Sequence, residues 1–166
     1  ELSHYFPLDQ DGSRPIAYLW ARTVKCEAPN CGAEIPLTRS FWLSKRSANR
    51  AALRHRAVQI GRNAPRVDLD VIRPKSLSEV QDGTVTRGKA TCLCCGTILP
   101  VERVRAQLAE QRGGGDVVFD DSGQRLGGAR LLAVVVVRPD GRGRQYRLPM
   151  ERDYQAVRDA VSRVDQ

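Results

Sequence analysis

Long apolar runs, histidines and methionines are scarce in this chain of 166 residues. The longest apolar run covers residues 131–137, far short of the roughly 20 residues that a membrane-spanning helix needs. The first residues also lack the charged and then apolar pattern of a signal peptide. These absences argue against a membrane partner, and we expect a cytoplasmic protein.

Motifs for catalysis are missing as well. The sequence has no phosphate-binding loop, no Gly-x-Gly-x-x-Gly, and nothing like the Pro-Pro-Tyr or Pro-Pro-Trp motif with which amino-methyltransferases hold a target base. No motif pairs either histidine, His4 or His55, with a nucleophile. We therefore expect a non-catalytic chain. Since it begins at Glu1 and its one methionine is Met150, we also expect it to be a segment of a longer protein.

Against this background the five cysteines stand out, because four of them form two matched halves. The first half, which we call the first knuckle, covers residues 26–32, and the second knuckle covers residues 92–96. Both continue as Cys-Gly-x-x-aliphatic-Pro-aliphatic. Two such Cys-turn-Cys-Gly halves, far apart in sequence, supply the thiolates of a tetrahedral zinc site of the zinc-ribbon kind.

The glycine that ends each knuckle decides the expected ligand set. Gly32 and Gly96 follow the last cysteine of their knuckles and permit the backbone geometry of a tight turn. This position selects Cys95 over the adjacent Cys94, which we expect to be a small residue at the tip of the turn. The expected ligands of a structural zinc ion are Cys26, Cys31, Cys92 and Cys95. A closed site of four cysteines stabilises the fold and does not activate water.

An oxidised Cys92–Cys95 redox pair is the rival interpretation. A thioredoxin-like pair belongs between a strand and a helix of a βαβ unit, and it would leave Cys26 and Cys31 unexplained. Clustered cysteines in a reducing compartment are more often metal ligands than disulfides.

The positive charge is concentrated in one stretch. The formal net charge is +8, and no acidic residue lies between Glu34 and Asp68, where eight lysines and arginines accumulate. Cations follow a phosphate backbone and aromatic rings offer stacking surfaces, so this stretch favours contact with a nucleic acid. The alternative is that the arginines form a solvated face. The candidate nucleic-acid-binding residues are Arg39, Trp42, Lys45, Arg46, Arg50, Arg54 and Arg56. Whether Phe41 and Trp42 pack in the core or lie on the surface stays open.

The pattern of apolar residues and turn formers predicts an α+β fold: zinc-ribbon-like β-hairpins with additional antiparallel strands and two helices. The strands are expected at residues 15–25, 35–45, 50–60, 67–72, 83–87, 130–138 and 144–148. One helix should cover residues 100–112, with Pro100 at its first position and Gly113 as its cap. The other should carry an apolar stripe of Tyr154, Val157, Val161 and Val164.

These elements suggest three segments. Residues 1–14 would be an extension from a preceding part of the parent protein. Residues 15–112 would form the zinc-ribbon domain with its basic, strand-rich insertion. Residues 113–166 would add a β-hairpin and an amphipathic helix that pack on the same core.

Four strings of the sequence resemble a known family. They are "PIAYLWARTVKC", "CGAEIPLTRSFWLSKR", "TVTRGKATCLCCGTILPVERVRAQLAEQRGG" and "GRGRQYRLP". They are similar to the zinc-ribbon insert of the prokaryotic adenine-specific DNA methylase family that contains a Zn-ribbon. The resemblance extends from about Pro15 to the C-terminal helix. The second knuckle departs from the family's usual Cys-Pro-x-Cys-Gly, because Leu93 and Cys94 stand between its cysteines.

The resemblance implies a parent enzyme that transfers a methyl group from S-adenosylmethionine to adenine N6, in phage defence or restriction–modification. The zinc ligands carry over to the four knuckle cysteines, whereas S-adenosylmethionine would bind only elsewhere in the parent. The expected function is thus a zinc-ribbon module that contacts DNA for this methylase. The alternative is a structural or protein-interaction module that braces the remainder of the parent or docks a partner subunit.

Overall fold

A computed structural model of the chain describes residues 3–111 and 128–164. In chain order the elements are η1 (Ser3–Tyr5), β1 (Arg14–Lys25), β2 (Glu34–Pro36), β3 (Trp42–Ser44), η2 (Ser47–Asn49), β4 (Ala51–Val58), β5 (Arg66–Ile72), η3 (Leu77–Glu79), β6 (Val85–Thr86), β7 (Lys89–Thr91), β8 (Ile98–Leu99), α1 (Val101–Glu110), β9 (Ala129–Val137), β10 (Arg144–Arg147) and α2 (Glu151–Val164). The expected α+β class is confirmed: two α-helices accompany three antiparallel sheets in the described part.

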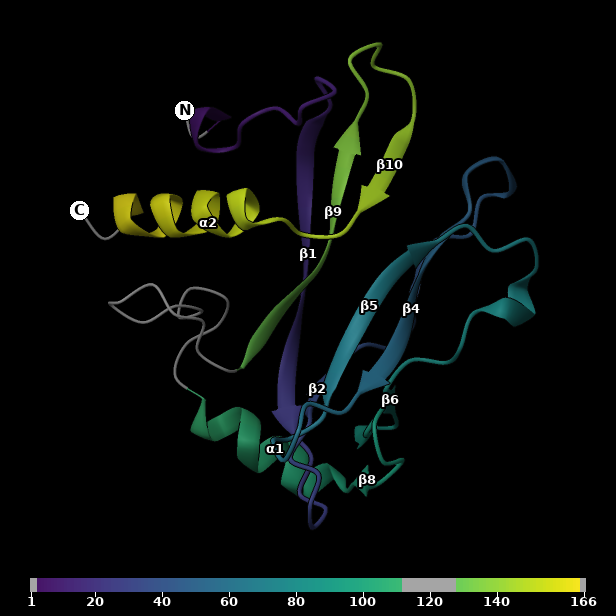
Figure 1. The fold of residues 1–166 in the computed structure, drawn as a ribbon, viewed down its shortest axis with the longest axis vertical. Coiled ribbons are helices and arrows are strands. Elements are labelled where there is room, and N and C mark those ends of the chain that lie inside the picture. Colours follow the sequence, from purple (N-terminus) through teal and green to yellow (C-terminus); the bar gives the residue numbers. More distant parts are fainter. Residues whose placement is uncertain (1–2, 112–127, 165–166) are drawn as a thin grey trace.

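The long strand β1 organises the first sheet, whose order is β10-β9-β1-β2. β1 pairs with β9 over Arg14–Arg22 and then with β2 over Thr23–Lys25, in both cases antiparallel. Figure 1 shows β1 running nearly the full height of the molecule, with α2 near its upper half and α1 beneath its lower end. One strand therefore connects the two ends of the protein.

The second sheet, of order β3-β4-β5, is built on a long hairpin. β4 and β5 pair over seven residue pairs from Ala52↔Ile72 to Val58↔Arg66. The third sheet, β6-β7-β8, is small and is followed directly by α1. The predicted strands at 50–60 and 67–72 are confirmed, with slightly different ends.

The single returning strand predicted over residues 35–45 is wrong. The chain forms β2 and β3 instead, which belong to different sheets. Past Pro36 the backbone pairs once more with β1, as the N–H of Leu37 donates to the carbonyl of Arg22 at 2.7 Å, and a turn follows in which the Thr38 hydroxyl donates to the carbonyl of Ser40 at 2.7 Å. The first hairpin nevertheless exists, because β2 pairs with the end of β1.

The two helices lie where the sequence predicts them. α1 ends at Glu110, and Pro100 is its N-cap rather than its first residue, with φ −69° and ψ 161°. Gly113, the expected cap at the other end, lies outside the described residues. Neither described helix is long and apolar enough to cross a membrane.

The apolar stripe of α2 is buried only in part. Asp153 and Ala156 are its buried residues, and Tyr154 packs against the core. Val157 and Val161 are half-buried. The side chain of Val164, the last residue of the predicted stripe, is outside the described part.

Apolar side chains gather in three clusters, and β1 contributes to each. The cysteine core consists of Val24, Cys26, Cys31, Ala33, Ile35, Ala90, Cys92, Leu99 and Val104. The central core consists of Ala21, Phe41, Leu53, Val67, Leu69, Leu132 and Ala133. The distal core consists of Leu131, Val134 and Val136, against which Tyr18, Trp20 and Tyr154 pack. β9 supplies both the central and the distal core, which confirms the prediction that this strand is buried on both faces.

Candidate metal centre

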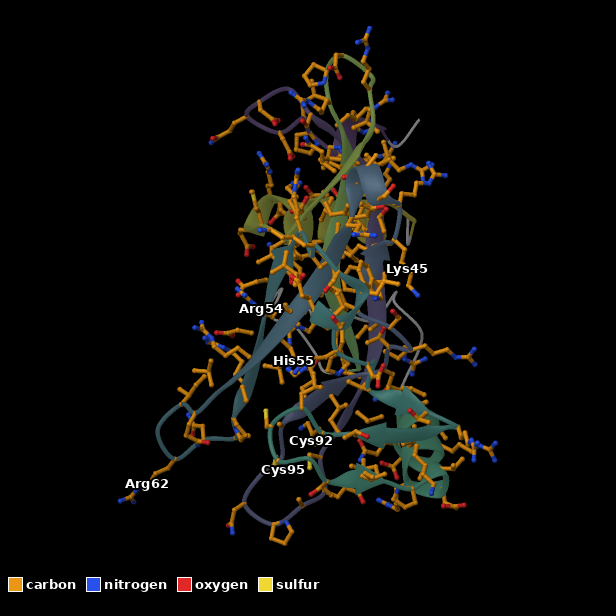
Figure 2. The ribbon with its side chains drawn as sticks, turned by 90° about the vertical axis from the view of Figure 1, so that its right-hand side faces the viewer. Lys45, Arg54, His55, Arg62, Cys92 and Cys95 are labelled. Carbon is orange, nitrogen blue, oxygen red and sulfur yellow. The ribbon has the colours of Figure 1, made fainter. Side chains whose placement is uncertain are left out.

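Four cysteine thiols converge at the lower end of β1. Cys26 directly follows β1 and Cys31 precedes β2, whereas Cys92 follows β7 and Cys95 precedes β8. Each knuckle is therefore the turn of a β-hairpin, and the two turns face each other. Their four sulfur atoms all lie within 4.8 Å of one another. Figure 2 shows Cys92 and Cys95 side by side at this end of the molecule.

Backbone hydrogen bonds hold the two knuckles in equivalent shapes. The N–H of Cys26 donates to the carbonyl of Ala33 at 2.8 Å, and the N–H of Cys92 donates to that of Thr97 at 2.9 Å. The closing glycines, Gly32 and Gly96, have φ of 65° and 75°. These are left-handed conformations that a residue with a Cβ adopts only with strain, which confirms the reason for glycine at both positions.

The sulfur–sulfur distances fit a tetrahedral metal site. Cys26 Sγ lies 3.5 Å from Cys95 Sγ, and Cys31 Sγ lies 3.7 Å from Cys92 Sγ. Zinc–sulfur bonds of about 2.3 Å in a tetrahedron place the sulfur atoms about 3.8 Å apart. The distances are far longer than the roughly 2.05 Å of a disulfide, and all five cysteines are free. The cluster is consistent with a zinc-binding site, and the donor set of four thiols suits that ion.

The thiols differ in their tendency to ionise. A hydrogen bond with the hydroxyl of Thr97, 3.3 Å away, lowers the pKa of the exposed Cys95 to about 6. Burial raises the pKa of Cys26 to about 12 and raises that of Cys31 as well. Since a metal binds thiolates, binding at this site must release protons, chiefly from Cys26 and Cys31.

The fifth cysteine, Cys94, is outside the four-thiol cluster. Its half-buried side chain packs against both the cysteine core and the central core, so it fills space between them rather than standing free at the tip of the turn. Burial raises the pKa of its thiol to about 11, which disfavours ionisation.

Polar side chains of α1 and of the residue after it bind the end of β1 and the start of the first knuckle, through contacts that the sequence did not reveal. The side chain of Gln107 accepts from the N–H of Lys25 at 2.7 Å and donates to its carbonyl at 2.9 Å. Arg103 forms a bidentate pair with Glu27, the residue after Cys26. Gln111 donates to the carbonyl of Thr23 at 2.7 Å. Arg103 and Gln107 lie four residues apart on one face of α1, and Gln111, the residue after the helix, continues this spacing, which was the available signal in the sequence.

A buried hydroxyl joins the two hairpins. The side chain of Thr84 donates to the carbonyl of Pro36 at 2.5 Å and accepts from the N–H of Thr38 at 3.0 Å. Nearby, Gly83 lies so close to the backbone of Arg39 that a Cβ would come within 2.5 Å of it. The segments before β3 and before β6 are therefore held together without room for a larger residue.

The predicted nucleic-acid-binding residues do not form one continuous face. Arg39, Lys45 and Arg46 are exposed, and the ammonium of Lys45 lies 5.9 Å from the centre of the Trp42 ring. Figure 2 shows Lys45 and Arg54 pointing to opposite sides of the molecule. The basic stretch is thus divided between two surfaces.

The Arg54 side of the hairpin carries acidic residues from β5. Arg54 pairs with Asp70 at 3.5 Å, and Arg56 lies opposite Asp68 in the register. Arg50 is half-buried, and its guanidinium donates to the carbonyl of Lys75. A stretch free of acidic residues in sequence is therefore not free of them in space.

The two aromatic residues of the basic stretch have different environments. Phe41 is 1% exposed and its ring lies 5.3 Å from that of His55, so Phe41 belongs to the central core. Trp42 is half-buried beneath Lys45. Burial also lowers the pKa of His55, which keeps this imidazole neutral near pH 7.

Comparison of the chain with models of protein families, with curated proteins and with solved structures finds no match. The centre is accordingly described by its own geometry: four cysteines from two hairpins, consistent with zinc, on an α+β scaffold.

Proposed function

We propose that this chain is a non-catalytic zinc-ribbon module that binds a structural zinc ion and contacts DNA. The observation that carries the proposal is the convergence of Cys26, Cys31, Cys92 and Cys95 to within 4.8 Å. Four thiolates would complete the coordination of zinc and leave no position for water or substrate. The ion would then stabilise the cysteine core and not take part in a reaction.

The DNA-binding part of the proposal centres on a surface of Arg39, Trp42, Lys45 and Arg46, which we call the Trp42 surface. Its three cations are exposed and form no ion pair with any residue in 3–111 or 128–164. Unpaired cations gain most from phosphate, because no protein partner is lost and counterions are released. The half-buried indole adds an apolar edge. Arg50, Arg54 and Arg56 remain candidates but start with acidic or backbone partners.

The charge-reversed pair Lys45→Glu with Arg46→Glu tests this surface. We expect it to reduce affinity for a labelled 20-base-pair duplex by roughly 100-fold at 0.1 M salt, and to leave the thermal midpoint unchanged because both side chains are exposed. Fluorescence anisotropy and calorimetry measure the two effects.

Arg62→Glu with Arg142→Glu is the matched control, because it reverses two exposed charges in the β4–β5 and β9–β10 turns, outside the candidate residues. A wild-type chain that does not bind DNA at low salt would contradict the proposal. A Lys45→Glu, Arg46→Glu double variant that binds DNA as tightly as the wild type would also contradict it.

We further propose that the parent protein is an S-adenosylmethionine-dependent adenine-specific DNA methylase. The resemblance of the four sequence strings supports this, whereas S-adenosylmethionine would bind elsewhere in the parent. In the full-length protein, the Lys45→Glu and Arg46→Glu substitutions should raise the DNA concentration needed for methyl transfer and leave cofactor affinity unchanged. An assay of adenine methylation with varied DNA checks this.

The second candidate is a protein-interaction module within the parent. The half-buried Val157 and Val161 of α2, together with the exposed Met150, favour it because they extend the partly covered apolar side of this helix. If Val157→Asp and Val161→Asp disrupt assembly of the parent while DNA affinity is unchanged, this role is supported.

A further inference from the structure

The turn between β6 and β7 holds an arginine in an unfavourable backbone conformation. Thr86 pairs with Lys89, so Arg87 and Gly88 form a two-residue hairpin turn, with φ of 49° and 80°. Two positive φ values define a type I′ turn, in which Asn-Gly is strongly preferred. An arginine at the first position is strained and gains nothing from its side chain within the turn.

The cations of this turn are available to a ligand. Arg87 and Lys89 are exposed, and neither forms a hydrogen bond through its side chain or an ion pair within the described residues. Glu102, the exposed acidic residue at the start of α1, is not paired with them there either. Two unpaired positive charges thus stand at one hairpin tip.

The turn packs on α1 and is continuous with a strand of the cysteine core. Gly88 lies against Val101 of α1, where a Cβ would come within 3.3 Å of the valine side chain. β7 is the strand that leads directly into Cys92, and its middle residue, Ala90, is fully buried in the cysteine core. The position of the two cations is therefore set by the metal centre and by α1.

The turn is also connected to the Trp42 surface. The N–H of Val85 donates to the carbonyl of Thr38 at 3.0 Å, and the backbones of Ser40 and Asp82 form an isolated antiparallel β-bridge. These contacts hold the segment that enters β6 against the residues on either side of Arg39. In Figure 2 the ribbon of β6–β8 lies below Lys45, on the side of the hairpin away from Arg54.

We propose that Arg87 and Lys89 contact the phosphate backbone of the DNA duplex bound by the Trp42 surface. This inference rests on the DNA-binding function proposed above and extends its site to the second knuckle. The strain at Arg87 is then the cost of placing a long cationic side chain at the end of this hairpin. Zinc binding and DNA contact are linked, because the same hairpin supplies Lys89 and Cys92.

Arg87→Asn tests the contact without damage to the turn, because asparagine suits a left-handed position and carries no charge. We expect affinity for a 20-base-pair duplex to fall roughly fivefold to tenfold at 0.1 M salt, and the slope of log affinity against log salt to shrink by about one. Arg87→Lys should retain most of the affinity. The thermal midpoint of Arg87→Asn should equal or exceed that of the wild type.

Arg142→Asn is the matched control. Arg142 is exposed in the β9–β10 turn, at the opposite end of the molecule from β6, and its substitution removes the same charge. We expect its affinity to equal that of the wild type. Equal losses of DNA affinity in Arg87→Asn and Arg142→Asn would show that the loss reflects only the lower net charge, and would overturn the inference.

The two levels of proposal can fail separately. If the wild type binds DNA and Arg87→Asn binds equally well with the same salt slope, the contact at this turn is wrong but the function stands. If the wild type does not bind DNA at all, the proposed DNA-binding function is wrong, and so is this inference.

Discussion

Cys94 and Cys95 are neighbours in sequence, yet their thiols have opposite properties. Cys95 is exposed and hydrogen-bonded to Thr97, which lowers its pKa to about 6, whereas burial raises the pKa of Cys94 to about 11. The Cys95 sulfur joins the four-thiol cluster and that of Cys94 packs against apolar neighbours. The position of Gly96 after Cys95 is the local feature that separates the two roles.

This difference predicts opposite effects of two adjacent substitutions. Cys95→Ala should weaken zinc binding by roughly 100-fold or more, because one of four ligands is lost. Cys94→Ala should retain one zinc ion per chain and change the free energy of unfolding by only about 1 kcal/mol. Metal analysis after dialysis measures both. Loss of zinc from Cys94→Ala with retention in Cys95→Ala would reverse the ligand assignment.

Among the elements, β10 and α2 are joined to the N-terminal segment by a buried ionic group. Arg147 donates to Asp153 at 2.6 Å and to Asp9 at 2.6 Å, and its side chain is 15% exposed against 2% for Asp153. Tyr18 of β1 donates to Asp153 at 3.2 Å, and burial beside this carboxylate raises the pKa of the phenol. The contact between α2 and the sheet thus includes a buried ionic group at the start of the helix.

Asp153 makes the stability of this end of the protein dependent on pH. Burial alone would raise the pKa of Asp153, but hydrogen bonds from Arg147 and from the N–H of Met150 outweigh it and hold the pKa below its usual value. A carboxylate with a lowered pKa stabilises the folded state above its unfolded pKa of about 4, and the contribution is lost as the pH falls below that value.

We therefore expect Asp153→Asn to cost roughly 3 kcal/mol at pH 7, because Arg147 loses one buried partner. The variant should also lose less stability than the wild type between about pH 4 and pH 2. Urea unfolding across this range measures both effects. Glu151→Gln, at an exposed position in the same helical turn, is the control; it removes only an exposed ion pair with Arg158 and should change the free energy of unfolding by less than about 1 kcal/mol. Parallel acid curves for Asp153→Asn and the wild type would contradict the assignment.

For the whole molecule, the three clusters along β1 differ in whether they contain the candidate metal ligands. The cysteine core contains three of the four thiols, packed among small and aliphatic side chains such as Val24, Ile35 and Leu99. The central and distal cores contain none of the four. Without the ion, no metal–sulfur bonds would hold the four thiols together. The β1–β9 ladder would still keep its apolar contacts.

Chelation of zinc should therefore unfold the lower end first. We expect hydrogen exchange to show loss of protection in β7, β8 and α1, with protection of the β1–β9 ladder retained. Retained protection in β7 and β8 after complete metal removal would show that the cysteine core is stable by itself. Restored protection on addition of zinc is the control for damage by the chelator.

The sequence by itself determined the features that depend on local spacing. Two Cys-turn-Cys-Gly halves identified the four thiols that converge, because a knuckle is a short turn whose glycine must be left-handed. Alternating and continuous apolar residues placed most strands and both helices, and the α+β class followed from them. These properties need only neighbouring residues, so they could be predicted.

Only the tertiary structure decided how distant segments meet. Strand pairing brought Asp68 and Asp70 beside Arg56 and Arg54, and it divided a basic stretch between two sides of one hairpin. The contact between residues 38–40 and 82–85 placed the segment that enters β6 next to Arg39. Charges and hydrogen-bonding groups act on whatever lies near them in space, and that proximity depends on long-range pairing that no local pattern records.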